Sequence, residues 1–157
     1  RIFKEKYKIP VYIVRPAHTY GPGQDFNDPR IIPQLIKRAY KNKYIHLFDS
    51  GRSIRTWGYI ADIAIMILNI AQYGKSMIYN VSGNDHISIM DVAKVISNLF
   101  GKKKILIKNK KLSYTNSNYT TLKISSKKYH LEFKNNFKTN FIDGINKSIK
   151  WNKLWQK

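Results

Sequence analysis

The most constraining feature of the chain is the segment at residues 11–23, with the sequence VYIVRPAHTYGPG. Its apolar, β-rich start is bounded by Gly and Pro, which is typical of an interior strand of a parallel sheet. Ligands of such sheets bind at the carboxyl ends of the strands, so Arg15, His18 and Tyr20 lie where a site is expected. A parallel sheet needs further strands, yet only RIFKEKYKIP precedes this one.

The rest of the chain alternates short apolar segments with helical patterns, which predicts an α/β fold. Ser88, followed three residues later by Asp91, fits a helix N-cap with an acidic first turn, and Gly101 fits a helix end. Asp62 is expected to cap a helix that is apolar almost all round and therefore buried. Strands are expected at residues 11–14, 44–48, 54–60, 77–81, 86–89 and 103–107, helices at 2–8, 29–42, 63–72, 90–100, 125–131 and 141–150, and long loops at 15–29 and 108–118.

The charge of the chain is extreme. A net charge of +20, from 29 Lys and Arg against 9 Asp and Glu, suggests by itself a polyanionic partner. However, the basic residues are spread out, and no recognition-helix, OB or RRM signature accompanies them. We therefore expect no specific nucleic-acid partner. A non-catalytic basic module that binds nucleic acid or another polyanion is the alternative function.

Length and composition narrow the class of protein further. A chain of 157 residues can form one ordinary domain with a usable core. It has no cysteine, which excludes disulfides and cysteine-based metal sites and fits a cytoplasmic protein. No apolar run is long enough to span a membrane and no signal-type segment is present, so we expect no membrane partner.

Several segments together carry a family resemblance. VRPAHTYGPG resembles the segment after the catalytic helix in extended short-chain dehydrogenase/reductases, namely the NAD-dependent nucleotide-sugar epimerases, 4,6-dehydratases and glucuronate decarboxylases. The family pattern there is Arg-x-x-Asn-x-Tyr-Gly-Pro, and this chain has His18 in place of the Asn. Further segments that resemble family motifs are DPRIIP at residues 28–33, HLFDSG at 46–51, RTWGYIAD at 55–62, YNVSG at 79–83 and ISSKK at 124–128. Because they follow in the expected order, the chain is identified as a member of this family.

The resemblance implies a particular part of the family fold. We expect the last strands of a Rossmann-type parallel sheet and a small mixed α/β substrate-binding lobe, with the amino-terminal NAD-binding half absent. Residues 1–157 would be the carboxyl-terminal portion of one enzyme. Residues 1–23 and 75–85 would supply Rossmann strands with their loops, and residues 24–74 and 86–157 mainly the substrate-binding lobe.

The sequence lacks the motifs for cofactor binding and catalysis. A dinucleotide site needs a Gly-rich turn between a strand and a helix, and the chain contains no G-x-x-G-x-x-G. The family's catalytic Tyr-x-x-x-Lys pair belongs to the helix that leads into residues 11–14. Tyr119 and Lys123 have this spacing, but they lie in a polar stretch that no such strand follows. We therefore expect no catalytic residue here, a bound NAD mostly outside this chain, and an inactive chain on its own.

The resemblance also implies residues that bind the charged part of a substrate. His18 matches the Asn that binds the sugar or diphosphate, with a structural role in the loop as the alternative. Arg30 matches a basic residue near the nucleotide, or is a solvated charge at a helix start. Arg55 matches the Arg that grips the diphosphate, which suits a planar guanidinium with several donors, whereas the alternative is a surface salt bridge.

Other positions are implied for the base, the sugar and the nicotinamide. Leu47 and Phe48 match the segment that packs on the base, and an ordinary core strand explains them equally well. Pro16 matches a residue near the nicotinamide and would also end its strand. Asn84 follows a strand end and is expected to contact substrate.

The implied function is the substrate-binding half of an NAD-dependent nucleotide-sugar epimerase/dehydratase, which oxidises the sugar at C4 and then eliminates, decarboxylates or inverts. Its expected partners are a nucleotide-diphosphate sugar, the missing amino-terminal half and a second copy in a homodimer of the parent enzyme. Without the other half, an apolar strand edge and face should be exposed. A degenerate homologue kept as an assembly subunit is a third possibility.

Overall fold

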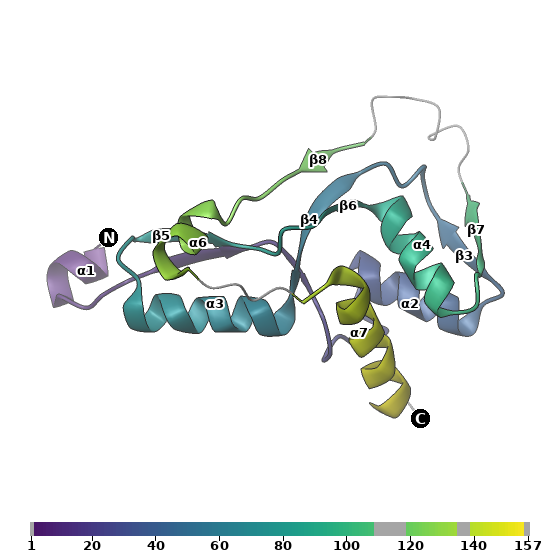
Figure 1. The fold of residues 1–157 in the computed structure, drawn as a ribbon, viewed down its shortest axis with the longest axis horizontal. Coiled ribbons are helices and arrows are strands. Elements are labelled where there is room, and N and C mark those ends of the chain that lie inside the picture. The colour runs from purple at the N-terminus through teal and green to yellow at the C-terminus, as the bar shows by residue number, and fades with distance from the viewer. Residues whose placement is uncertain (1, 109–118, 135–138, 156–157) are drawn as a thin grey trace.

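The structure is a computed structural model that describes residues 2–108, 119–134 and 139–155. It confirms the α/β class, with three small sheets and helices packed around them (Figure 1). The strands are β1 (Ile13–Pro16), β2 (His18–Tyr20), β3 (Tyr44–Leu47), β4 (Ile54–Tyr59), β5 (Ile78–Val81), β6 (His86–Ser88), β7 (Lys104–Ile107) and β8 (Thr121–Leu122). The helices are α1 (Ile2–Tyr7), α2 (Ile31–Lys41), α3 (Ile60–Tyr73), α4 (Ile89–Leu99), α6 (Lys127–Phe133) and α7 (Phe141–Trp155).

One end of the molecule is built on the parallel pair β1 and β5, which the sequence predicted as strands of one parallel sheet. The register pairs Ile13 with Ile78 and Pro16 with Val81. Strand β1 spans Ile13–Pro16 and not the expected residues 11–14, so it begins two residues later than predicted. Helices α3 and α6 lie next to this sheet (Figure 1), and a small core of side chains joins them to it. Its buried residues are Ile63, Met66, Ile70, Tyr79, Val81 and Tyr129.

Helix α3 corrects two expectations. The helix begins at Ile60, with Tyr59 as its N-cap, so Asp62 lies inside the first turn. The Asp62 carboxylate instead accepts hydrogen bonds from the Thr139 backbone N–H (2.8 Å) and hydroxyl (3.1 Å), which ties α3 to the segment before α7. The prediction that α3 is buried all round is wrong, because Leu68 is 60% exposed and Tyr73 is 68% exposed. Only one stripe of the helix packs against the sheet.

The middle of the molecule is organised by β4. This strand pairs in parallel with β2 and β8 and antiparallel with β6. The short strands β2 and β8 were not predicted, because each lies in a polar segment without an apolar strand pattern. Both are defined by their pairing with β4, which the sequence does not reveal. The N-cap of α4 is confirmed, since the Ser88 hydroxyl accepts from the Asp91 N–H at 3.1 Å.

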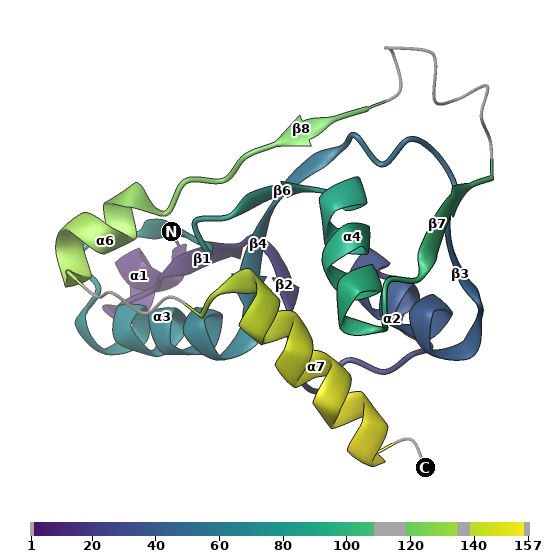
Figure 2. The same ribbon diagram turned by 45° about the vertical axis from the view of Figure 1, so that its right-hand side comes forward.

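The main core lies at the other end, where α2 and α4 pack between β4 and the parallel pair β3 and β7. Helix α7 lies against β2 and α4 (Figure 2). The buried residues of this core include Tyr20, Ile32, Leu35, Ile36, Ala39, Ile45, Leu47, Trp57, Val92, Ile96, Phe141 and Ile145.

Most of the loop predicted at residues 108–118 falls outside the described residues. Among the helices of the described ranges, none has the length and apolar character needed to cross a membrane.

Candidate functional site

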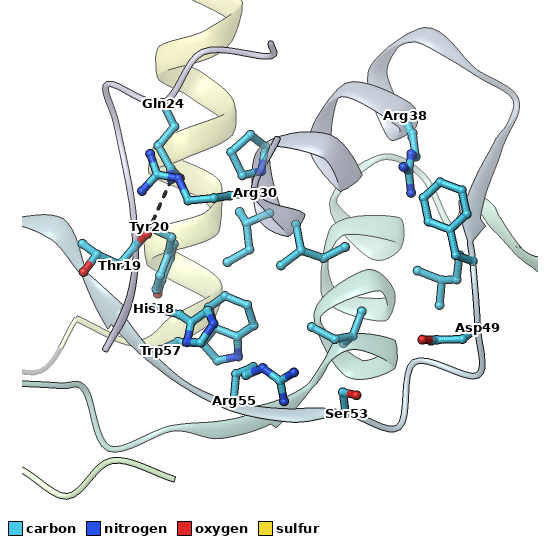
Figure 3. Close-up of a pocket in the computed structure, with 16 residues that line it drawn as sticks. His18, Thr19, Tyr20, Gln24, Arg30, Arg38, Asp49, Ser53, Arg55 and Trp57 are labelled. Atoms are coloured by element: carbon cyan, nitrogen blue, oxygen red, sulfur yellow. Dashed lines mark hydrogen bonds between the residues drawn. The ribbon is translucent and has the colours of Figure 1, made fainter. Parts of the chain in front are cut away.

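A cavity of about 410 Å³ opens between β2, the start of α2, the end of β3 and β4 (Figure 3). Five residues predicted from the sequence line it together: His18, Arg30, Leu47, Phe48 and Arg55. They come from four elements or their adjoining turns, so the fold, rather than one motif, brings them to one place. The remaining lining residues are Thr19, Tyr20, Gln24, Ile31, Ile32, Pro33, Arg38, Asp49, Ser53, Trp57 and Ile89.

Arg55 points from β4 along the floor of the cavity (Figure 3). Its Nη1 donates to the carbonyl oxygens of Ile54 (2.8 Å) and Thr120 (2.7 Å), and its Nη2 donates to the Thr120 hydroxyl at 2.7 Å. The salt bridge that was its alternative role does not form with any described acid. Its positive charge therefore has no carboxylate partner within the described part of the chain.

His18 lies beside Arg55 and packs edge-on against the Trp57 ring, with 5.5 Å between the ring centroids. Trp57 is buried and donates from its indole Nε1 to the carbonyl oxygen of Ile87 at 3.2 Å, so its ring position is fixed. Partial burial lowers the pKa of His18 below 6.5, and the positive charge of Arg55 lowers it further. The imidazole is therefore neutral at neutral pH and offers one donor and one acceptor.

This environment predicts how His18 titrates. An NMR titration of the imidazole, assigned with a His18→Asn variant, should give a pKa below 6.5. Arg55→Ala should raise that pKa, because it removes the repelling charge and leaves the burial in place. Since the folded pKa is depressed, the stability that His18 contributes is present above 6.5 and is lost as pH falls through the folded pKa. Titration of His18 at or above 6.5 in the unsubstituted chain would contradict this arrangement.

Arg30 lies at the rim, where it precedes α2 as the N-cap residue. Its guanidinium forms an ion pair with Asp28, and its Nε lies 2.9 Å from Oδ1 and from Oδ2 of that carboxylate. This hydrogen bonding lowers the pKa of Asp28. The side chain of Arg30 is largely exposed, so it is able to turn toward an anion in the cavity at modest cost.

Two residues at the opposite wall form a cation–π pair. The Arg38 guanidinium lies 5.0 Å from the centroid of the Phe48 ring, and its Nη1 donates to the His46 carbonyl oxygen at 2.7 Å. The Lys108 Nζ lies 5.7 Å from the centroid of the same ring, and Phe48 is 63% exposed, so an aromatic side chain flanked by two cations stands at the cavity mouth. The sequence interpretation missed Arg38, whose only signal was a basic side chain in the last turn of the helix before the strand that carries Phe48.

Two predicted residues lie elsewhere. Asn84 lines a second cavity, of about 590 Å³, together with Tyr59, Asp62 and Asp85. Pro16 ends β1, is exposed, and pairs with Val81 of β5. Both therefore lie at the carboxyl ends of the β1–β5 pair and not in the cavity that Arg55 lines.

Tyr20 reaches both cavities, but its hydroxyl is not suited to act as a base. The side chain is buried, and the hydroxyl donates to the Phe141 carbonyl oxygen at 3.4 Å. Burial, reinforced by the nearby acids Asp85 and Asp62, raises the pKa of Tyr20 far above its usual range. This tyrosine stays protonated at any physiological pH.

The charges of the first cavity favour an anion. Arg30, Arg38 and Arg55 line it, whereas Asp49 is its acidic lining residue among those described. The Asp49 carboxylate is engaged by the turn that follows, where it accepts from the Gly51 N–H at 2.8 Å. Arginines at the edge of an apolar, aromatic-lined cleft are able to hold a ligand that joins a planar ring to phosphate groups.

Comparison with known proteins identifies the family of the chain. Residues 1–82 match the NAD dependent epimerase/dehydratase family. The chain belongs to this family. The extended short-chain dehydrogenase/reductase resemblance seen in the sequence is thereby confirmed, and so is the NAD dependence of the family.

The chain aligns with only a part of each curated relative. Over 96 residues the chain is 32% identical to dTDP-D-glucose 4,6-dehydratase of Homo sapiens, covering 60% of this chain and 27% of that protein. Over 104 residues it is 29% identical to a dTDP-4-dehydro-6-deoxy-D-allose reductase of a Streptomyces species, covering 65% and 32%. The chain thus spans about a third of these relatives.

Solved structures match nearly the whole chain. The dTDP-glucose 4,6-dehydratase of Bacillus anthracis, in complex with NAD, is 25% identical with a TM-score of 0.77, covering 98% of this chain and 48% of that one. The UDP-glucose 4-epimerase of Thermotoga maritima, with UDP-glucose, has a TM-score of 0.84 at 16% identity, covering 99% and 50%. The second likeness shows the fold alone.

The residues that the structure describes do not form a complete site for NAD. The element that follows β1 is the strand β2, not a helix, and Gly21 and Gly23 come after β2, eight or more residues before α2 begins at Ile31. In the described ranges, neither β1 nor β5 leads through a Gly-rich turn directly into a helix. We therefore derive no chemical step through NAD on this chain.

Proposed function

We propose that the chain is the substrate-binding half of an NAD-dependent nucleotide-sugar epimerase or dehydratase. The proposed ligand of the 410 Å³ cavity is the nucleotide diphosphate part of the substrate. The observation that supports this most is the meeting of Arg30, Arg38 and Arg55 with an exposed aromatic ring in one cleft. Membership in the epimerase/dehydratase family supplies the class of reaction.

The geometry suggests a division of roles. Arg55, from the floor, and Arg30, from the rim, would bind the diphosphate oxygens, because planar guanidinium groups match oxyanions with paired donors. The neutral imidazole of His18 would add one hydrogen bond without a further charge. Phe48, with Leu47 behind it, would pack on the base at the cavity mouth.

The reacting sugar would then extend toward the ends of β1 and β5. Pro16 would lie near the nicotinamide there, and Asn84 would contact the sugar. In the whole enzyme the sugar would be oxidised at C4 and then undergo elimination, decarboxylation or inversion. The catalytic base would come from outside this chain, which on its own would be inactive.

The amino-terminal half would cover the apolar surface that this chain leaves exposed. Helix α3 presents Ile67, Leu68 and Tyr73 outward, and the paired residues Ile13 and Ile78 are 42% and 37% exposed. Among the described strands, β1 pairs with β5 alone, so one of its edges has open backbone groups. Parallel sheets are normally covered on both faces, and a surface of this kind favours docking of a further parallel α/β layer.

The exposed stripe of α3 also predicts association of the isolated chain. Leu68→Gln should shift the chain toward monomer, because it removes an apolar contact and adds a group that prefers water. Light scattering after gel filtration over a range of concentrations would measure this shift. Leu122→Gln, at a residue of β8 that is 52% exposed, should leave the association unchanged. Equal effects of the two substitutions would contradict a role for α3.

A thermal-shift screen tests the proposed function. UDP-, dTDP-, GDP- and CDP-sugars, an RNA oligonucleotide and NAD would each be added to the 157-residue chain. At least one sugar nucleotide should raise the melting temperature, since a ligand that binds only the folded state stabilises it. NAD should show no binding by calorimetry. Stabilisation by RNA without any by sugar nucleotides would favour the basic-module alternative, and micromolar affinity for NAD would contradict the substrate-half assignment.

A further inference from the structure

The guanidinium of Arg55 is held from one side by a residue far away in the chain. Thr120 accepts from Nη1 with its carbonyl oxygen and from Nη2 with its hydroxyl, both at 2.7 Å. The two residues are 65 positions apart, so the contact depends on the fold and not on local sequence. Two oxygens of Thr120 therefore accept from the edge of the guanidinium that Nη1 and Nη2 form.

Thr120 is itself fixed to the strand that carries Arg55. Its N–H donates to the Ser53 hydroxyl at 3.2 Å, and its carbonyl oxygen also accepts from the Ile54 N–H at 3.0 Å. Immediately afterwards β8 pairs with β4, and the Ile124 N–H donates to the Thr56 hydroxyl at 2.8 Å. Both residues of β8 are exposed, so its contribution to the fold is mainly hydrogen bonding along β4.

The donors of Arg55 show what this contact leaves available. A guanidinium carries five N–H groups. The bonds to Ile54 and Thr120 use both hydrogens of Nη1 and one of Nη2. Within the described residues, the Nε–H and the second Nη2–H donate to no acceptor. These two lie on one edge of the guanidinium plane, and such an edge matches two oxygens of a phosphate group.

We infer that Thr120 is a positioning residue for Arg55, which it holds so that the Nε and Nη2 edge is presented to the diphosphate of a sugar nucleotide. This inference rests on the proposed function of the cavity and explains how the Arg55 guanidinium on the cavity floor is oriented. An arginine side chain has many rotamers, and fixing one before binding removes part of the entropic cost of binding. Thr120 lies outside the cavity lining, so it would act through Arg55 and not by touching the ligand.

A double-mutant cycle tests this role, with calorimetric affinity for UDP-glucose and dTDP-glucose as the readout. Thr120→Val keeps the shape of the side chain and removes the hydroxyl acceptor, so affinity should fall about tenfold, the low end of the effect of one charge-assisted hydrogen bond. Thr120→Ser should restore affinity to within about twofold, because the hydroxyl returns. Thr121→Val, the same substitution one residue later, should have no effect. In an Arg55→Ala background, Thr120→Val should cause no further loss.

Each result separates this inference from its alternatives. Unchanged affinity in Thr120→Val would overturn the positioning role while leaving the proposed function in place. An equal loss in the Arg55→Ala background would overturn it too, because Thr120 would then support the fold in general. Melting temperatures would accompany every variant, and Thr120→Ala would replace the valine variant if that one did not fold. No binding of either sugar nucleotide to the unsubstituted chain would contradict the proposed function itself.

Discussion

Replacing Arg55 with Ala is expected to lower the affinity of the chain for its sugar nucleotide by about 100-fold, because the diphosphate loses a contact with a charged group that offers two donors. Arg55 lies on the cavity floor, has no carboxylate partner among the described residues, and keeps two N–H groups available on one edge. Arg55→Lys should recover only part of the loss, since an ammonium group cannot reproduce the planar pair of donors. Isothermal calorimetry on the three proteins would give the affinities.

The matched control for this change is Arg52→Ala. Arg52 is an exposed arginine in the turn before β4 and does not line the cavity. Arg52→Ala removes the same charge from the same region as Arg55→Ala. The affinity lost in Arg52→Ala therefore measures the general attraction of a chain with a net charge of +20 for any anion. Equal losses from Arg52→Ala and Arg55→Ala would mean that the chain attracts the ligand by its overall charge, which would contradict a specific diphosphate contact.

The sequence was most informative where a segment resembles a family motif or shows a strong hydrophobic periodicity. The strand before His18 and the five cavity residues belong to segments that resemble family motifs, whereas the helix with its cap at Ser88 was predicted from its periodicity and its cap. Their meeting in one cleft follows from the family fold, which orders the motifs in space as well as in sequence. Local patterns alone gave no distance between His18 and Arg55, which lie on neighbouring strands only because β2 pairs with β4.

The expectations that failed concern contacts between distant segments. Asp62 looked like a helix cap, but its carboxylate bonds to Thr139, 77 residues later. The uniform apolar character of α3 predicted burial, and the structure leaves Leu68 exposed because no described element packs on that side. Strand β8 has two residues and no apolar pattern, so its pairing, and the contact between Arg55 and Thr120, could not be read from the sequence.

The second large effect is expected on stability, at Gly83. The residue lies just after β5, and its N–H donates to the Trp57 carbonyl oxygen at 2.9 Å. A Cβ at this position would lie 2.4 Å from the same oxygen, a distance that real Cβ atoms do not adopt. The glycine thus allows the end of β5 to approach β4, the strand that carries Arg55 and Trp57 of the cavity.

Gly83→Ala should therefore lower the free energy of unfolding by about 2–3 kcal/mol, since the clash is with backbone that has little freedom to move. Urea denaturation would measure the change. Gly101→Ala is the control without a clash, because no atom lies within 4 Å of its added Cβ. Gly101 has a φ of 76°, whereas Gly83 is not among the glycines with positive φ. This control therefore carries a left-handed strain of about 1 kcal/mol that Gly83→Ala does not have, and any excess cost of Gly83→Ala is due to the clash. If the two substitutions cost the same, the close approach of β5 to β4 would not be the reason for a glycine at residue 83. If Gly83→Ala costs more and also weakens sugar-nucleotide binding, the spacing of the two strands sets the position of the cavity floor.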